Sequence, residues 1–105
     1  SMGYMATNPE GLKRWLEIHH HSQQKGAPAQ PQRTTITFDK LATIRVPTLL
    51  MPGDQDLQCP PWVMRRQLAR IPGAEFIILP EASHSINWEQ PEAFNRHVLE
   101  FIHKH

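Results

Sequence analysis

The sequence predicts an α/β fold built on a short parallel sheet. Two segments, 46–51 and 74–80, are apolar almost throughout. Strands of this kind are typical of a parallel sheet covered on both faces, because a strand with one solvated face alternates between apolar and polar residues. Segments 60–73 and 90–105 carry apolar residues at helical spacing. The order strand, helix, strand, helix is a βαβα unit, whose crossover we expect to be right-handed.

Residues 8–22 are expected to form a helix. Asn8 can cap it, and Pro9 suits its first position because the proline ring already has a helical φ. One apolar face follows at helical spacing, made by Leu12, Trp15 and Leu16. Three consecutive histidines, 19–21, lie near the end of this helix. They cannot converge on one metal ion, because consecutive helical residues point about 100° apart.

The connecting segments are expected to be short turns and loops. Residues 22–35 are polar and contain one glycine and two prolines, which indicates a loop or linker. Asp39 is expected to cap a single short helical turn. The predicted helix 60–73 begins with proline and ends with glycine. Residues 81–89 predict a loop that leads into the last helix.

Composition limits the classes of partner. The 105 residues suit one small domain, and eleven Lys and Arg balance ten Asp and Glu. No basic cluster indicates a nucleic-acid partner. No apolar run approaches the roughly 18 residues of a membrane helix, and the N-terminus lacks the order of a signal peptide, so we expect no membrane partner. Cys59 is the single cysteine, so an internal disulfide is impossible and a cytoplasmic location is the default expectation.

Acidic and histidine residues follow the two predicted strands. Asp54 and Asp56 come directly after the first strand, and His84 comes shortly after the second. Neighbouring parallel strands point the same way and lie about 4.8 Å apart, so these side chains should meet at the carboxyl edge, where open α/β sheets bind ligands. A carboxylate beside an imidazole fixes its tautomer and stabilises its protonated form, which suits a general base. An Asp after a strand is also common as a simple turn residue, so both interpretations stay open.

These segments resemble the C-terminal third of an α/β-hydrolase. The stretch "VPTLLMPGDQD" is similar to the family's strand and acid motif, approximately "vPtLvi.G..D", and "AEFIILPEASHSINWEQPEAFNRHVLEFI" is similar to its last strand, "GHxxxxExPexF" motif and closing helix. The resemblance implies that Asp56 is the acid and His84 the histidine of a nucleophile–His–acid triad, whereas Asp54 falls on a variable position. Residues 1–38 resemble the end of a cap. The chain would thus divide into a cap-like helix with a polar linker (1–38) and a C-terminal core part (39–105).

Other positions near the histidine match the family or depart from it. Glu89, Pro91 and Phe94 match the family's residues before and within the closing helix. Ser83 stands where the family most often has Gly, and the residue there is still small. Trp88, just after the histidine, is expected to wall a substrate pocket or, alternatively, to anchor the loop by packing.

The chain lacks the motif that carries the nucleophile in that family. No two of its five glycines are four residues apart, so it has no G-x-S-x-G elbow. We therefore expect the nucleophile to lie before residue 1. Local substitutes are less favoured: Cys59 three residues after the acid, Ser83 or Ser85 beside the histidine, and Ser1 at the N-terminus.

The resemblance implies hydrolysis of a small-molecule organic substrate without a metal or organic cofactor. A nucleophile held elsewhere would attack the substrate, and His84 would activate the water that releases the product. Two parallel strands are too few to form a sheet that stands alone, so an upstream hydrolase segment or a second chain should complete it. The alternative is a non-catalytic hydrolase remnant that acts as an interaction module through its open sheet edge.

Overall fold

The computed structural model describes residues 1–23, 26, 31 and 33–105. The linker predicted for 22–35 falls partly on residues 24–25, 27–30 and 32, which lie outside the described residues. The linker therefore stays a prediction over that stretch.

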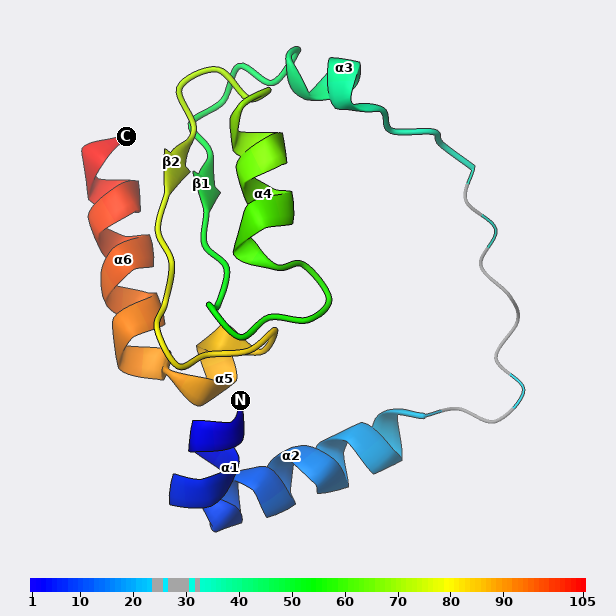
Figure 1. The fold of residues 1–105 in the computed structure, drawn as a ribbon, viewed down its shortest axis with the longest axis vertical. Helices are drawn as coiled ribbons and strands as arrows, with labels where there is room; N and C mark the ends of the chain where they lie inside the picture. Colours follow the sequence, from blue (N-terminus) through cyan, green and yellow to red (C-terminus); the bar gives the residue numbers. More distant parts are fainter. Residues whose placement is uncertain (24–25, 27–30, 32) are drawn as a thin grey trace.

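The described residues form helices on both sides of a small sheet. In chain order the elements are α1 (Met2–Thr7), α2 (Pro9–Ser22), α3 (Phe38–Leu41), β1 (Leu49–Leu50), α4 (Pro61–Leu68), β2 (Glu75–Phe76), α5 (Ile86–Glu89) and α6 (Pro91–Lys104). Figure 1 shows β1 and β2 between α4 and α6, with α5 at one end of the strands and α1 and α2 below α5 in that view. The βαβα order predicted from the sequence is present.

The two strands are parallel, as predicted. The pairs are Leu49–Glu75 and Leu50–Phe76, extended by an isolated parallel bridge between Gly53 and Leu79. The regular strands are shorter than the predicted segments 46–51 and 74–80. Pro47 and Pro52 have no backbone N–H to donate, which interrupts the regular ladder of the first strand. Pairing continues beyond Pro52, because its carbonyl accepts from the Leu79 N–H at 2.9 Å.

Helices cover opposite faces of the sheet. Successive strand residues point to opposite faces. In β2, the Phe76 ring lies under the Arg65 guanidinium of α4, 4.9 Å away. Its neighbour Glu75 accepts a hydrogen bond of 2.7 Å from Lys104 of α6. Helices α4 and α6 therefore lie on different faces of the sheet.

The described residues bury little apolar surface. Their buried apolar residues are Ile71, Leu79 and Ala82, and the Pro52 side chain is fully buried. The radius of gyration is 16.3 Å, larger than the about 13 Å expected for a compact domain of this length. Large exposed apolar side chains include Val46, Trp62, Leu99 and Ile102. Extensive exposed apolar surface is typical of faces that contact other protein.

Two of the predicted helices are confirmed and one is shorter than predicted. Helices α2 and α6 agree with the predictions for 8–22 and 90–105, and the Asn8 side chain caps α2 by accepting from the Gly11 N–H at 2.8 Å. Helix α4 ends at Leu68, before the end of the predicted 60–73. Ala69 is its C-cap, and the chain continues in a turn in which the Arg70 N–H donates to the Gln67 carbonyl at 2.9 Å. Gly73, with a φ of 72°, lies in the turn that leads into β2.

The predicted cap of the short turn near residue 39 is wrong. Thr37 is the N-cap of α3, with extended backbone angles (φ −103°, ψ 163°), while Asp39 lies inside the first helical turn. The Asp39 carboxylate instead pairs with Arg70 at 3.4 Å. An acid inside the first turn is favoured by the helix dipole, which explains why the sequence pattern alone did not separate the two positions.

Two short helices were not predicted. Segment 81–89 was expected to be a loop throughout, but Ile86–Glu89 forms the single-turn helix α5. Helix α1 has only six residues, too few to display a periodic apolar face, and Ser1 caps it by accepting from the Tyr4 N–H at 3.2 Å. Single turns of this kind depend on their surroundings for stability.

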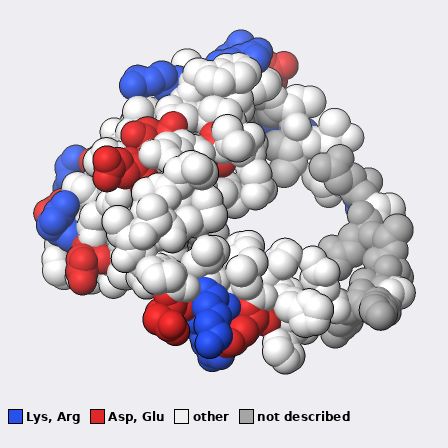
Figure 2. All heavy atoms as spheres, turned by 60° about the horizontal axis from the view of Figure 1, so that its bottom comes forward, with Lys and Arg blue, Asp and Glu red and all other residues white. Residues whose placement is uncertain are grey.

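Charges are mixed on the surface. On the face drawn in Figure 2, the Lys and Arg side chains lie among Asp and Glu side chains and do not form one broad basic patch. Across the part of the chain that the structure describes, no helix has the length and apolar character that a membrane span requires.

Candidate functional site

The loop after β1 buries Asp56. This side chain is 4% exposed, although carboxylates are rarely buried without partners. Its Oδ1 accepts backbone hydrogen bonds from Gln58 at 2.8 Å and from Cys59 at 2.9 Å. An Asp side chain that bonds to the backbone two and three residues later is a common way to close a turn. The local sequence therefore holds one carboxylate oxygen and leaves Oδ2 for another partner.

The second oxygen of Asp56 contacts His84. The distance between Asp56 Oδ2 and His84 Nδ1 is 2.9 Å, and the His84 side chain is 53% exposed. This contact agrees with the placement expected for two loops at one sheet edge. With Asp56 ionised, Nδ1 carries the proton and donates, which leaves the Nε2 lone pair of a neutral ring available. Asp56 is the one hydrogen-bond partner of the ring among the described residues.

Hydrogen bonds keep the Asp56 carboxylate ionised. Burial is the strongest single influence on its pKa and acts to raise it, because a charged group is poorly solvated inside protein. The Cys59 N–H, the His84 ring and the Gln58 N–H together outweigh burial and hold the pKa of Asp56 below its ordinary value of 3.8. Asp56 is therefore a carboxylate near neutral pH and can accept the hydrogen bond from Nδ1–H.

Asp54 points to backbone and not to the histidine. Its side chain is exposed, and its Oδ1 accepts from the Ala82 N–H at 3.3 Å. The sequence analysis had placed it on a variable position. The structure gives it a contact that joins the Asp54 loop to the loop of His84.

The two loops approach each other closely at Gly53, a feature that the sequence analysis missed. A Cβ atom on Gly53 would lie 2.1 Å from the Ala82 carbonyl oxygen, closer than any real contact. Beside it, the Gln55 N–H donates to the same oxygen at 2.9 Å. Only glycine permits this approach, and the Pro-Gly pair after an apolar strand was the available signal in the sequence.

Glu89 is a second buried acid at this site. Its side chain is 6% exposed, and Oε2 contacts the Ser1 amino group at 2.9 Å and accepts from the Ser83 N–H at 3.2 Å. The Ser83 hydroxyl donates to Oε1. Burial acts most strongly to raise the pKa of Glu89, but the bonds from the Ser1 amino group and from Ser83 hold it below 4.5. Glu89 matches the family motif, but the sequence pattern does not reveal these contacts.

A groove of about 580 Å³ lies beside His84. Its lining residues come from α1 and from both loops: Ser1, Met2, Met5, Gln55, Leu57, Gln58, Ser83 and His84. The apolar part consists of Met2 and Met5 of α1 and Leu57, which is 93% exposed. The exposed ring of His84 therefore adjoins apolar side chains from the N-terminal helix.

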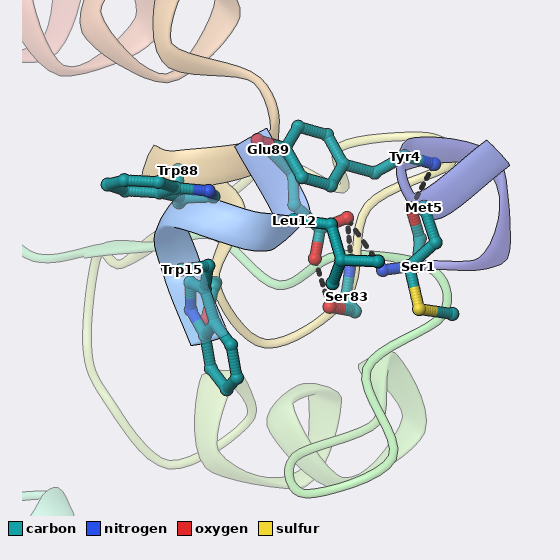
Figure 3. Close-up of a pocket in the computed structure, with 9 residues that line it drawn as sticks. Ser1, Tyr4, Met5, Leu12, Trp15, Ser83, Trp88 and Glu89 are labelled. Atoms are coloured by element: carbon teal, nitrogen blue, oxygen red, sulfur yellow. Dashed lines mark hydrogen bonds and ion pairs between the residues drawn. The ribbon is translucent and has the colours of Figure 1, made fainter. Parts of the chain in front are cut away.

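Trp88 lines a neighbouring cavity. Figure 3 shows its ring beside α2, with Trp15 and Leu12 of that helix and Glu89 nearby. The cavity measures about 160 Å³ and is lined by Ser1, Tyr4, Met5, Leu12, Trp15, Ser83, Ser85, Trp88 and Glu89. His84 lines the groove and not this cavity. The Trp88 Nε1–H is buried without a partner among the described residues, and the expected role of Trp88 as a substrate-pocket wall stays a prediction.

The alternative nucleophiles do not bond to the histidine. The Cys59 backbone N–H donates to Asp56, and the Ser83 hydroxyl donates to Glu89. Ser1 lines the His84 groove, but its hydroxyl accepts from Tyr4. Within residues 1–23, 26, 31 and 33–105, no group of three or more His, Cys, Asp or Glu side chains is arranged to hold a metal ion.

Comparison with known proteins gives the family. The sequence profile of the Alpha/beta hydrolase family matches residues 3–97. Over 84 residues, the chain is 34% identical to a 2-hydroxy-6-oxononadienedioate/2-hydroxy-6-oxononatrienedioate hydrolase of Cupriavidus pinatubonensis, covering 80% of this chain and 29% of that enzyme. The chain belongs to the α/β-hydrolase family.

Solved structures agree with this assignment. A thermophilic esterase from Thermogutta terrifontis, solved with malate bound, superposes with a TM-score of 0.62 at 33% identity, covering 64% of this chain and 25% of that one. The enol-lactonase from Burkholderia xenovorans LB400 gives a TM-score of 0.59 at 34% identity, covering 62% of this chain and 25% of that one. The chain spans between 29% and 34% of the length of the curated relatives it matches.

Proposed function

We propose that this chain acts as the C-terminal part of an α/β-hydrolase and supplies the acid and the histidine of a nucleophile–His–acid triad. The observation that carries the proposal is the 2.9 Å contact between the buried Asp56 carboxylate and His84 Nδ1 at the carboxyl edge of a parallel sheet. The family match over residues 3–97 supports it independently.

Each residue has a definite chemical task in this scheme. His84 Nε2 takes a proton from a hydroxyl nucleophile as that nucleophile attacks a substrate carbonyl carbon, and gives the proton to the leaving group. Nε2 next takes a proton from water as the water attacks the acyl intermediate. It then gives this proton to the nucleophile oxygen as the bond between that oxygen and the acyl group breaks and the acid product leaves. Asp56 holds the ring in the tautomer with Nδ1 protonated and stabilises the imidazolium that forms in each half-reaction.

The nucleophile and the oxyanion donors come from outside this chain in the proposal. An upstream hydrolase segment, or a second chain, pairs with the free edge of β1 and covers exposed apolar residues such as Val46, Leu99 and Ile102. The small buried core and the radius of gyration of 16.3 Å support this need for a further segment. We call this chain together with such a segment the assembled protein.

The substrate in this proposal is a small organic carbonyl compound with an apolar group. The groove beside His84 supports this choice, because Met2, Met5 and Leu57 supply apolar surface next to the ring. Residues 1–38 serve as the end of a cap, since α1 contributes two of these side chains. Trp88 walls the second cavity, which Trp15 of α2 also lines.

Reconstitution tests the proposal. The chain is joined to an upstream segment that bears a G-x-S-x-G elbow. We expect turnover of a p-nitrophenyl ester by the assembled protein and no measurable turnover by either piece alone, because the isolated chain lacks oxyanion donors that are each worth about 10²–10³ in rate. Robust turnover by the isolated chain, lost in Cys59→Ala or Ser1→Ala, would place the nucleophile within this chain and contradict the proposal.

A second candidate function is a non-catalytic remnant that binds a partner through its open sheet edge. Among the described residues, β1 pairs with β2 on one side and with no other strand. This unpaired edge, together with exposed apolar residues such as Val46, favours this candidate. It predicts that an assembled protein forms with unchanged affinity in His84→Ala and has no esterase activity at all. The catalytic proposal predicts the same assembly with turnover that depends on His84.

A further inference from the structure

Glu89 accepts hydrogen bonds from the residue that precedes His84. The Glu89 carboxylate is 6% exposed and comes from α5, after the histidine in sequence. Two of its contacts are with Ser83, the residue directly before His84: the backbone N–H at 3.2 Å and the hydroxyl. A buried carboxylate needs such donors, because an unpaired charge is very costly away from water.

The residue before Ser83 is fixed from the other side. The Ala82 N–H donates to Asp54, and its carbonyl accepts from the Gln55 N–H at 2.9 Å. Gly53 allows this close approach. The backbone just before His84 is thus bonded at Ala82 to the loop that follows β1, and at Ser83 to α5. The ring itself has one hydrogen bond among the described residues and is 53% exposed, so its backbone anchors must supply much of its order.

We propose that Glu89 is a positioning residue, which acts through the Ser83 amide and hydroxyl to keep the His84 ring on Asp56. The hydroxyl contact is a feature of this chain, because Ser83 stands where glycine is usual in the family. A glycine would retain the amide contact and lose the hydroxyl contact. The inference rests on the proposed role of His84. It also explains why a carboxylate, that of Glu89, is buried in α5.

The test measures the His84 ring directly, without reference to turnover. The Nδ1 proton that bonds to Asp56 gives a low-field signal in ¹⁵N-histidine NMR spectra, and its rate of exchange with water reports how often the contact opens. The spectra are recorded on the full 105-residue chain, free and within the assembled protein, and the assembled protein decides where the two differ. Glu89→Gln is compared with Glu81→Gln, the same change at an exposed position of the loop that precedes α5.

We expect Glu89→Gln to speed the exchange of the Nδ1 proton about tenfold or more, the effect of losing a hydrogen bond to a charged group. Ser83→Ala should act in the same direction with a smaller change, because the amide contact remains. The double variant should be no faster than Glu89→Gln alone, since both changes act on one contact. Glu81→Gln should leave the rate within twofold.

Several results would overturn the inference. One is an unchanged exchange rate in Glu89→Gln, and another is full additivity of the two changes. An equal effect of Glu81→Gln would also overturn it, as would the absence of the signal from the unchanged protein, because then no contact exists to be held. If Glu89→Gln does not fold, Ser83→Ala decides, because it keeps the buried carboxylate and two of its donors, the Ser83 N–H and the Ser1 amino group. A protein with the intact signal and no turnover would contradict the proposed function and leave this inference standing.

Discussion

The two loops at the candidate site hold their functional side chains to very different degrees. Asp56 is 4% exposed and bonded through both carboxylate oxygens, whereas His84 is 53% exposed and bonded through one ring nitrogen. In the proposed function, this chain alone surrounds the acid, whereas one side of His84 stays open to a nucleophile supplied by another segment.

The difference follows from how each side chain is fixed. Two of the three bonds to Asp56 come from backbone two and three residues along the same turn, so they form whenever that turn forms. The bond to His84 joins residues 28 apart and depends on the pairing of two strands and on the contacts of Ala82 and Ser83. The acid is a local feature, and the histidine is placed by the tertiary structure.

Removing the histidine should have the largest effect. In the assembled protein, His84→Ala should lower kcat by about 10⁶-fold, since a triad without its base loses nearly all of the triad's contribution. Steady-state kinetics with a p-nitrophenyl ester measure this effect. The control is His103→Ala, an exposed histidine in the last turn of α6, which should keep full activity. Retained turnover in His84→Ala would exclude the histidine as the base.

Changing the buried acid should have the next largest effect. Asp56→Asn should lower kcat about 10⁴-fold, because the amide can hold the ring in the wrong tautomer. The matched control is Asp54→Asn, which keeps an acceptor oxygen for the Ala82 N–H and should alter kcat by less than about threefold, as expected for an exposed polar change. A larger loss from Asp54→Asn than from Asp56→Asn would reverse the assignment of the two acids.

The close approach of the two loops can be broken without touching either functional side chain. Gly53→Ala places a methyl group 2.1 Å from the Ala82 carbonyl oxygen, and we expect it to lower the free energy of unfolding of the assembled protein by about 1–3 kcal/mol, a usual cost of overpacking. The control is Gly3→Ala in α1, where no atom lies within 4 Å of the added carbon. Urea unfolding compares the two. Equal stability of both variants would show that the loops separate at little cost.

Low pH should destabilise the folded protein through protonation of Asp56. The pKa of this carboxylate is lower in the folded protein than its ordinary 3.8, so the unfolded chain binds more protons between the two values. The stabilisation is therefore fully present above about pH 5 and is lost as the pH falls through the folded pKa. Asp56→Asn removes this dependence, so the stabilities of the two proteins should converge on acidification. Thermal unfolding from pH 6 to pH 2 measures it, and a constant difference would contradict the cause given for the pKa.

Strong local patterns predicted the main elements. Apolar strands bounded by proline gave the parallel pair, and capped, periodic segments gave α2 and α6. Chain direction predicted that Asp54, Asp56 and His84 lie at one edge, because parallel strands bring their following loops together. The resemblance to the family motif then selected Asp56 over Asp54. An element or the placement of a side chain could therefore be predicted where its cause is local in sequence or follows from the order of the strands.

Other features depended on contacts that a single pattern does not reveal. Helices α1 and α5 are too short for periodicity to show, and Thr37 and Asp39 are both acceptable near a helix start. The burial of Glu89 against Ser83 and the approach of Gly53 to Ala82 arise only once the loops meet. Long-range packing of this kind is set by the tertiary structure. In the sequence, Gly53 and Ser83 are its only local indications.

We propose that Asp56 and His84 activate a nucleophile that lies outside this chain. Intact mass spectrometry of the assembled protein can locate this nucleophile after reaction with a fluorophosphonate, whose phosphorus is attacked by an activated hydroxyl with loss of fluoride. We expect one adduct on the elbow serine of the upstream segment, formed rapidly in the unchanged protein and only very slowly in His84→Ala, with no adduct on the 105-residue chain. An adduct on Ser1, Ser83, Ser85 or Cys59, or equally rapid labelling of the elbow serine in His84→Ala, would contradict this proposal.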